Sequence, residues 1–184
     1  MYWTYTITDF LDYFQAEYQK FWTAERIKKA NEIGLTPVQV TVMASIVEAE
    51  THKNDEKPRI AGVYMNRYNG GQRLQADPTL VYATGDFDAR RINEFHRYFK
   101  SPYNTYRRTG LPPGPINLPS IASIEAVLDY ERHDFYFFCA RPDLTGYHLF
   151  SKNFDEHLAV ARDYWKSLDK GNIHQNKRIK NSKN

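Results

Sequence analysis

The chain has 184 residues, enough to bury one sizeable core, so we expect a single domain. Its formal charge of +3 does not indicate a nucleic-acid partner, because five of the 25 Lys and Arg residues lie in the acid-free segment 170–184. We therefore predict a nearly neutral domain over residues 1–169 and a basic, disordered tail over residues 170–184. The single cysteine, Cys139, excludes a disulfide within the chain, and no apolar stretch is long enough for a membrane span, so we expect a soluble chain.

Helical patterns dominate the first third of the chain. Apolar residues at helical spacing predict one or two helices over residues 8–32, capped by Thr8 or Asp9 and ending near Gly34. The next stretch, "TPVQ" at residues 36–39, combines a threonine N-cap, a proline at the first helical position and a glutamine that completes a capping box. It predicts the start of a helix that continues to about residue 51.

The remaining elements alternate with turn signals. Five prolines and two glycines indicate a long loop over residues 101–119, and the capping-box pair Asn153 and Glu156 opens a last helix that we expect to end near Leu168. Together these patterns predict an α+β fold. The other expected elements are a helix over 59–68, a short helix with Asp77 as its cap, a helix over 120–130 and a β-hairpin from "DFYFFCA" and "GYHLFS".

The helix predicted after "TPVQ" ends in two glutamates with different orientations. At about 100° per residue, Met43 and Ile46 lie at the centre of its apolar stripe and Val38 lies on one flank. Glu50 follows Ile46 by four residues, so we expect it on the middle of the stripe. Glu48 lies on the opposite side, and we expect it to point outward.

A carboxylate on an apolar face is unfavourable unless it is paired or its pKa is raised. An acid that stays protonated near neutral pH can protonate a leaving group, which is a role of such residues in glycosidases. Periodicity alone leaves two other interpretations open. The helix end can fray and expose Glu50, or Glu50 can pair with an arginine such as Arg67.

Further polar and aromatic residues lie near turns. Gln75 and Asp77 precede the short helix, where capping alone explains Asp77. Tyr103, Asn104 and Tyr106 lie in the proline-rich loop, and this mixture of rings and an amide suits sugar stacking and hydrogen bonding. The six histidines show no metal-binding spacing and no phosphate-binding glycine pattern is present, so we expect no metal and no cofactor.

Several motifs in register resemble the YceG-like endolytic murein transglycosylase family, over roughly residues 36–165. These are "MASIVEAET", "AGVYMNRYNGGQRLQADPTLVYATG", "SPYNTYRRTGLPPGPI", "SIASIEAVL", "FYFFCA" and "GYHLFSKNFDEH". The detailed sequence around these motifs is similar to that of the Bacteroidetes branch of the family. The resemblance implies a mostly helical, lysozyme-like catalytic domain with a small β-hairpin.

The resemblance also implies the reaction. Such enzymes cleave peptidoglycan strands internally, between N-acetylmuramic acid (MurNAc) and N-acetylglucosamine (GlcNAc), and leave 1,6-anhydro-MurNAc ends. The family's catalytic glutamate, in an Ile-x-x-x-Glu-Thr pattern, falls on Glu50 before Thr51. Glu50 would act first as general acid and then as base. By the same resemblance, the substrate-binding residues would be Asn66, Gln75, Asp77, Tyr103, Asn104 and Tyr106.

The family context adds expectations about location and partners. Family members carry an N-terminal membrane helix and a LysM-like region, so the resemblance implies a parent protein anchored in the inner membrane with its catalytic domain in the periplasm. Peptidoglycan strands and cell-wall synthesis proteins are the implied partners. Where family members commonly read Asn-Pro-Gly, this chain has Leu118-Pro119-Ser120, which affects the shape of the site.

Three other functions stay open, and one of them is a structural partner in cell-wall synthesis whose binding surface matters more than catalysis. A non-catalytic peptidoglycan-binding module would keep the cleft residues without needing Glu50. A hydrolytic muramidase would use water and a second carboxylate such as Asp77, and it would produce reducing muramic ends.

Overall fold

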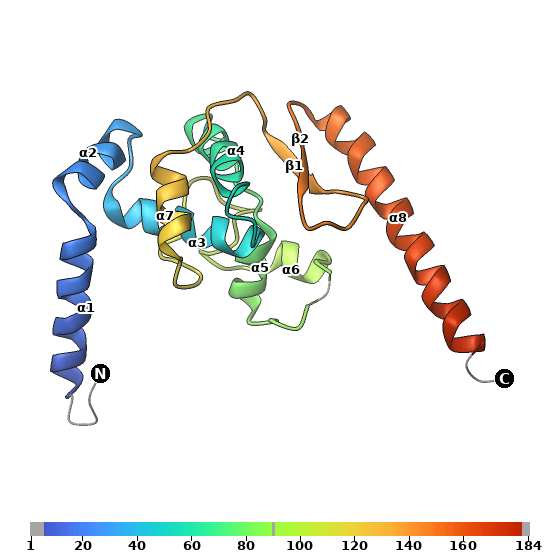
Figure 1. Ribbon diagram of the computed structural model, residues 1–184, viewed down its shortest axis with the longest axis horizontal. Coiled ribbons are helices and arrows are strands. Elements are labelled where there is room, and N and C mark those ends of the chain that lie inside the picture. Colours follow the sequence, from blue (N-terminus) through green and yellow to red (C-terminus); the bar gives the residue numbers. More distant parts are fainter. Residues whose placement is uncertain (1–5, 90, 182–184) are drawn as a thin grey trace.

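The structure is a computed structural model that describes residues 6–89 and 91–181, with side chains described as far as residue 167. Within these residues it contains eight helices and one two-stranded sheet (Figure 1). The helices are α1 (Ile7–Phe21), α2 (Ala24–Glu32), α3 (Pro37–Glu50), α4 (Lys57–Asn69), α5 (Asp77–Thr84), α6 (Glu94–Tyr98), α7 (Ile121–Leu128) and α8 (Phe154–Asn181). The strands are β1 (Phe137–Ala140) and β2 (His148–Ser151).

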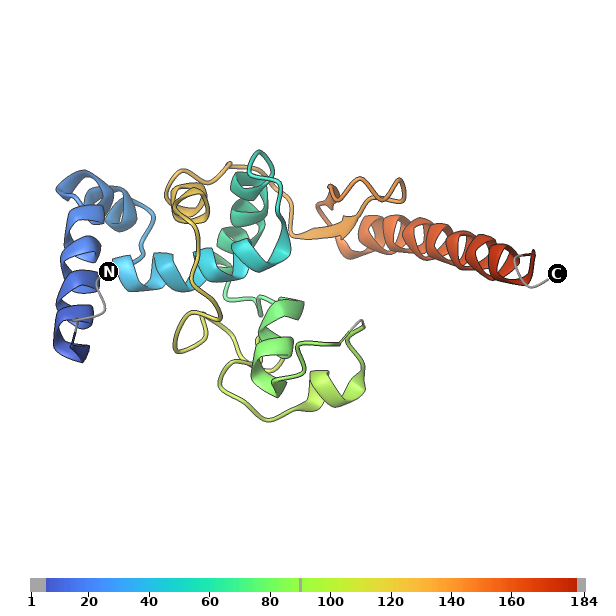
Figure 2. The same ribbon diagram turned by 60° about the horizontal axis from the view of Figure 1, so that its bottom comes forward.

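Helix α3 forms the centre of the core. It packs against α2, α4, α5 and α7 (Figure 2). Every residue from Val42 to Val47 is buried. The predicted apolar stripe is therefore wrong as a description of this helix, because neighbours surround it on nearly all sides. Val38, expected on the flank of that stripe, is 59% exposed, whereas Val40 in the same first turn of α3 is fully buried.

The β-hairpin and α8 lie at one end of the molecule. Strands β1 and β2 are antiparallel, with Phe138 opposite Phe150, and α8 packs against both strands before it continues away from the body (Figure 1). Helices with one small antiparallel sheet confirm the predicted α+β class.

Local cap signals predicted helix starts well. At α3, Gln39 N–H donates to Thr36 Oγ1 (3.3 Å) and Thr36 N–H donates to Gln39 Oε1 (2.8 Å), which confirms the capping box. At α1 the cap is Thr6 instead of the expected Thr8 or Asp9. The carboxylate of Asp9 accepts from Thr6 N–H, so Asp9 is the third helical residue of a capping box.

Two elements differ from the sequence prediction. Helix α6 was not predicted, because five residues are too few to show a helical period. Helix α8 runs past Leu168 to Asn181, so the backbone of residues 170–181 is helical. The side chains of this basic tail lie outside the described residues, and its disorder in solution stays a prediction.

Among the helices in the described part of the chain, none has the length and apolar character that crossing a bilayer requires.

Candidate active site

Glu50 is the last residue of α3, at the point where this helix leaves the core. The following residue, Thr51, is extended, and the Glu50 side chain is half-buried. Tyr64 Oη, from α4, donates a hydrogen bond to Glu50 Oε1. The expectation that Glu50 points toward the core side is met, and its hydrogen-bond partner is a tyrosine, not Arg67.

The surroundings of Glu50 favour its protonated form. Burial raises the pKa of its carboxyl from 4.5 to about 7, the hydrogen bond from Tyr64 acts against this rise, and the negative charge of Asp77 adds to it. A carboxyl group with a pKa near 7 is present in both protonation states at neutral pH. It can therefore donate a proton and later accept one.

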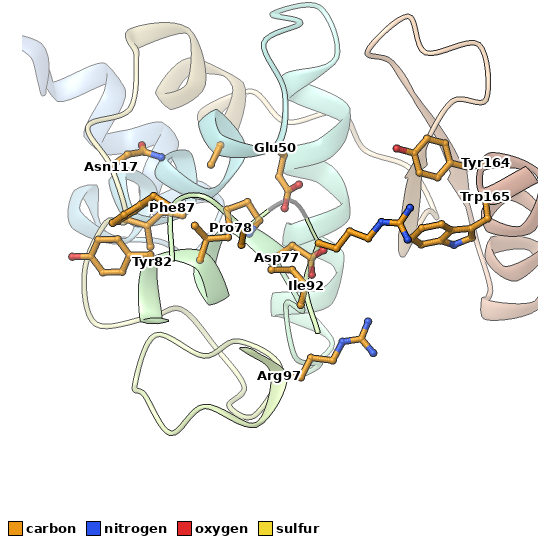
Figure 3. A pocket seen from close by; sticks show the side chains of 15 residues that line it. Glu50, Asp77, Pro78, Tyr82, Phe87, Ile92, Arg97, Asn117, Tyr164 and Trp165 are labelled. Carbon is orange, nitrogen blue, oxygen red and sulfur yellow. The ribbon is translucent and has the colours of Figure 1, made fainter. Parts of the chain in front are cut away.

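Asp77 supplies a second carboxylate beside Glu50. It is the first residue of α5, where Ala76 is the N-cap residue and no side chain caps the helix. Sequence reasoning assigned Asp77 as the cap, and this is wrong. Its Oδ1 instead accepts a 2.5 Å hydrogen bond from Tyr106 Oη. Asp77 is exposed, and its side chain points into the same space as Glu50 (Figure 3).

Glu50 and Asp77 lie where two hollows meet. The first hollow has a volume of about 760 Å³ and the second about 520 Å³. The residues that line both are Glu50, Asp77, Arg97, Tyr164 and Trp165. Together the two hollows form one cleft that passes the carboxylates, a shape that suits a polymer extending to both sides of a reacting bond.

Aromatic side chains line the first hollow on two sides. Tyr82 and Phe87 lie on one side, and Tyr164 and Trp165 of α8 lie on the other (Figure 3). The guanidinium group of Arg91 lies 5.0 Å from the centre of the Trp165 ring. Flat rings of this kind can stack on the faces of sugars.

The second hollow is shaped by Arg67, which is 7% exposed. Its guanidinium donates to the carbonyl oxygens of Tyr136 (2.6 Å) and Leu74 (3.1 Å), and to Gln75 Oε1 (2.9 Å). Arg67 thus holds the cleft wall in place, and the structure brings the predicted residue Gln75 into the cleft. Cys139 also lines this hollow, and burial raises the pKa of its thiol.

Three predicted substrate-binding residues are not among those that line the two hollows. Asn104 is fully buried, and its amide nitrogen donates to the carbonyl oxygens of Arg97 (3.1 Å) and Phe99 (2.8 Å). These bonds show that the amide of Asn104 holds the loop together, and its role in substrate binding stays a prediction. Asn66 likewise donates to backbone carbonyls, at 2.7 and 2.9 Å, and Tyr103 packs against Tyr82 with ring centres 4.7 Å apart.

Glu48 is not the simple surface residue that the helical phase predicted. Its Oε2 accepts hydrogen bonds from Lys57 Nζ (3.1 Å), Ser123 Oγ (2.6 Å) and both the Oγ (2.5 Å) and N–H of Ser120. Partial burial opposes ionisation of Glu48, but these bonds outweigh it and lower its pKa to about 2. Glu48 therefore ties the last turn of α3, which carries Glu50, to the starts of α4 and α7.

Sequence reasoning missed several residues of the cleft. Tyr64 lies in a predicted helix but gave no further signal, and Arg97 lies in α6, which was not predicted. Trp165 lies in the predicted last helix, where nothing in the sequence marked it as a cleft residue. Among the described residues, no group of three or more His, Cys, Asp or Glu side chains is placed to hold a metal ion.

The chain matches a protein-family model and is similar to curated proteins. The family model described as "YceG-like family" matches residues 1–163. A Bacillus subtilis (strain 168) protein named endolytic murein transglycosylase is 36% identical over 126 residues, covering 68% of this chain and 34% of that protein. A Streptococcus pneumoniae protein of the same name is 33% identical over 128 residues, covering 67% of this chain and 23% of that protein.

The chain is also similar to a solved structure of a yceG-like protein. The crystal structure of a yceG-like protein from Listeria monocytogenes has a TM-score of 0.67 and 36% identity, and the match covers 74% of this chain and 44% of that one. The chain thus spans about a third or less of the curated relatives' length. A family match over residues 1–163 covers most of the described site, and the chain belongs to the YceG-like family.

Proposed function

We propose that this chain carries the catalytic site of an endolytic lytic transglycosylase that cleaves the MurNAc–GlcNAc bond inside peptidoglycan strands and forms 1,6-anhydro-MurNAc ends. One observation carries the proposal: a half-buried glutamate whose pKa is raised to about 7, at the junction of two open hollows. The names of the Bacillus and Streptococcus relatives support the choice of murein as substrate.

In this proposal Glu50 acts twice. Its protonated form donates to the glycosidic oxygen, so the leaving GlcNAc departs as a neutral alcohol. The resulting carboxylate then removes the proton of the 6-hydroxyl of MurNAc, and that oxygen attacks the anomeric carbon of its own ring. An internal nucleophile gains from proximity, so no water and no nucleophilic side chain are needed. Tyr64 holds the Glu50 carboxyl in position between the two steps.

Asp77 supports positive charge on the sugar ring. Its carboxylate faces the same space as Glu50 and is held by Tyr106, so its negative charge is fixed where an oxocarbenium ion would develop. Because Asp77 also raises the pKa of Glu50, it assists the acid step as well.

The same carboxylate favours a second candidate, a hydrolytic muramidase. Glycosidases that use water commonly have two carboxylates that face one cleft. In that case Asp77 would assist the water or form a glycosyl intermediate, and the new ends would be reducing. The products separate the two candidates.

We also propose that the site acts on peptidoglycan in the periplasm, as part of a parent protein anchored in the inner membrane. Cell-wall synthesis proteins are its proposed partners. The murein named for the relatives supports an extracytoplasmic substrate.

The test is mass spectrometry of the products released from purified peptidoglycan by the wild-type chain and by Glu50→Gln. Glu32→Gln is the matched control, because Glu32 is an exposed carboxylate on α2 with 60% side-chain exposure. We expect anhydro-muramic ends from the wild type and the control, and none from Glu50→Gln. Reducing ends would replace the proposal with hydrolysis. A wild-type chain that binds strands and releases no product would indicate a binding module.

A further inference from the structure

A third hollow, with a volume of about 500 Å³, lies outside the cleft and is lined by arginines. Its walls include Arg73, Arg107 and Arg108, together with Thr109 and Leu111. All three arginines are exposed. We call this hollow the arginine pocket.

The arginine pocket carries positive charge without a partner in the described structure. Three other arginines, Arg26, Arg59 and Arg141, are paired with carboxylates: the guanidinium of Arg59, for example, lies 2.9 Å from the carboxylate of Glu131. Among the side chains that the structure describes, no carboxylate lies within 4.0 Å of the guanidinium groups of Arg73, Arg107 or Arg108. Three such arginines in one hollow are suited to an anionic ligand, because the planar guanidinium binds carboxylates with two parallel hydrogen bonds.

The chain segments that carry these arginines are the ones that line the cleft. Gln75 N–H donates to Thr105 O (3.2 Å) and Ala76 N–H donates to Thr105 Oγ1 (3.0 Å), so the two segments run side by side. Arg73 precedes the cleft residue Gln75 by two positions. Arg107 directly follows Tyr106, which lines the second hollow and holds Asp77. The arginine pocket is therefore built from the same two chain segments that contribute Gln75 and Tyr106 to the cleft.

The backbone of the arginine pocket is fixed by neighbouring groups. Arg67 Nη1 donates to Arg73 O (3.2 Å), and the N–H groups of Arg107 and Arg108 donate to Asn104 O (3.1 and 3.2 Å). The arginine side chains thus project from a held frame, which reduces the ordering needed to bind a ligand.

We propose that the arginine pocket binds the carboxylates of peptide stems, so that the site prefers peptide-bearing glycan strands over stripped ones. This inference rests on the proposed function and specifies its substrate class. A stem leaves the strand at the lactyl group of MurNAc, a residue that the reaction places beside Glu50. Stems carry several free carboxylates, and an extended stem of four or five residues reaches roughly 15 Å. Arg73 and the cleft residue Gln75 are two residues apart, a span of at most about 7 Å, which is shorter than that reach.

The experiment measures binding without turnover, in a Glu50→Gln parent. The probes are uncrosslinked glycan strands in three forms: with peptide stems, stripped of stems, and with the stem carboxylates converted to carboxamides. Dissociation constants are measured at one ionic strength for the parent and for a variant that adds Arg73→Gln, Arg107→Gln and Arg108→Gln. The charge-matched control adds Lys20→Gln, Lys28→Gln and Lys166→Gln instead, three exposed cations far from the pocket in sequence.

We expect the parent and the lysine control to bind peptide-bearing strands about tenfold more tightly than the other two forms, the effect of one or two charged hydrogen bonds. The arginine variant should bind all three forms alike. The inference is overturned if the parent shows no preference, if the arginine variant keeps it, or if the variant loses affinity for stripped strands equally. It is also overturned if polyphosphate displaces the strands from the parent more effectively than free stem peptide does, which would assign the pocket to a phosphate polymer. Product analysis of the wild type tests the proposed function separately.

Discussion

Replacing Glu50 with glutamine should stabilise the domain, and the gain should depend on pH. The folded-state pKa of Glu50 is about 7, against an ordinary value of 4.5. Below pH 4.5 the group is protonated in both folded and unfolded chains and has no effect. Between pH 4.5 and 7 only the unfolded chain releases the proton, so the free energy of unfolding falls as pH rises.

The change in the free energy of unfolding follows from the pKa shift of Glu50. Each pKa unit corresponds to about 1.4 kcal/mol, so the folded domain loses about 3 kcal/mol between pH 4.5 and pH 7. The introduced glutamine would keep the side-chain shape and a partner for Tyr64 without an ionisable proton. The variant should therefore match the wild type near pH 4.5 and exceed it by about 3 kcal/mol at pH 8, which is roughly 6 to 12 °C in melting temperature for a domain of this size.

The assay is urea unfolding at pH 4.5, 6 and 8, followed by the fluorescence of the buried Trp22. Glu48→Gln is an informative companion, because hydrogen bonds lower the pKa of Glu48 and its ionised form stabilises the fold. That variant should be less stable than the wild type above pH 4.5, with the difference disappearing toward pH 2. An equal stability of Glu50→Gln and wild type at pH 8 would refute the argument that burial suppresses ionisation of Glu50.

Three further predictions concern the cleft. Tyr64→Phe removes a hydrogen bond that favours ionised Glu50, so the basic limb of the pH–rate profile on peptidoglycan should move to higher pH. Asp77→Asn removes a charge that raises the Glu50 pKa, so the same limb should move to lower pH; an unchanged midpoint would contradict the electrostatic coupling. Asn104→Ala leaves several buried carbonyl groups without a donor and should lower the free energy of unfolding by about 3 kcal/mol in thermal melts, whereas Asn69→Ala at an exposed helix end should change it little.

Sequence reasoning succeeded where short-range chemistry decides the structure. The capping box of Thr36 and Gln39 needs only four residues, and these fix the start of α3 wherever the helix is placed. The Asn153 and Glu156 pair at α8 is equally local: Glu156 N–H donates to Asn153 Oδ1 at 2.9 Å. The β-hairpin strands were also predicted, because an apolar and aromatic run on each side of a turn is a local signal.

The same reasoning failed where a distant segment supplies the partner. Glu48 was placed on the surface because a helical wheel contains no information about Ser120 and Ser123, which lie more than 70 positions away. Asp77 looked like a cap because its nearest neighbours offered nothing else, whereas its actual partner is Tyr106. Composition also gave no sign that the amide of Asn104 joins carbonyl groups of the turn around it.

Glu50 stays the predicted catalytic residue, although part of the reason for choosing it was wrong. The wheel argument assumed that α3 has an apolar stripe and a polar side, whereas the helix is buried on nearly all sides from Val42 to Val47. What distinguishes Glu50 is that it ends the helix at the cleft, where one side of its carboxyl meets the core and the other meets solvent. A carboxyl group one turn earlier would be fully buried, and one turn later it would be in a loop.

The acid strength of Glu50 then depends on a balance between three elements. Burial at the end of α3 and the charge of Asp77 on α5 both favour the proton, while Tyr64 on α4 favours its release. Burial without the tyrosine would hold the proton too firmly for the base step, and the tyrosine without burial would give an ordinary carboxylate with no proton to donate at neutral pH. A single glutamate can serve as acid and then as base only between these limits. The contact that sets the balance joins residues 14 positions apart on two packed helices, and only the folded chain brings them together.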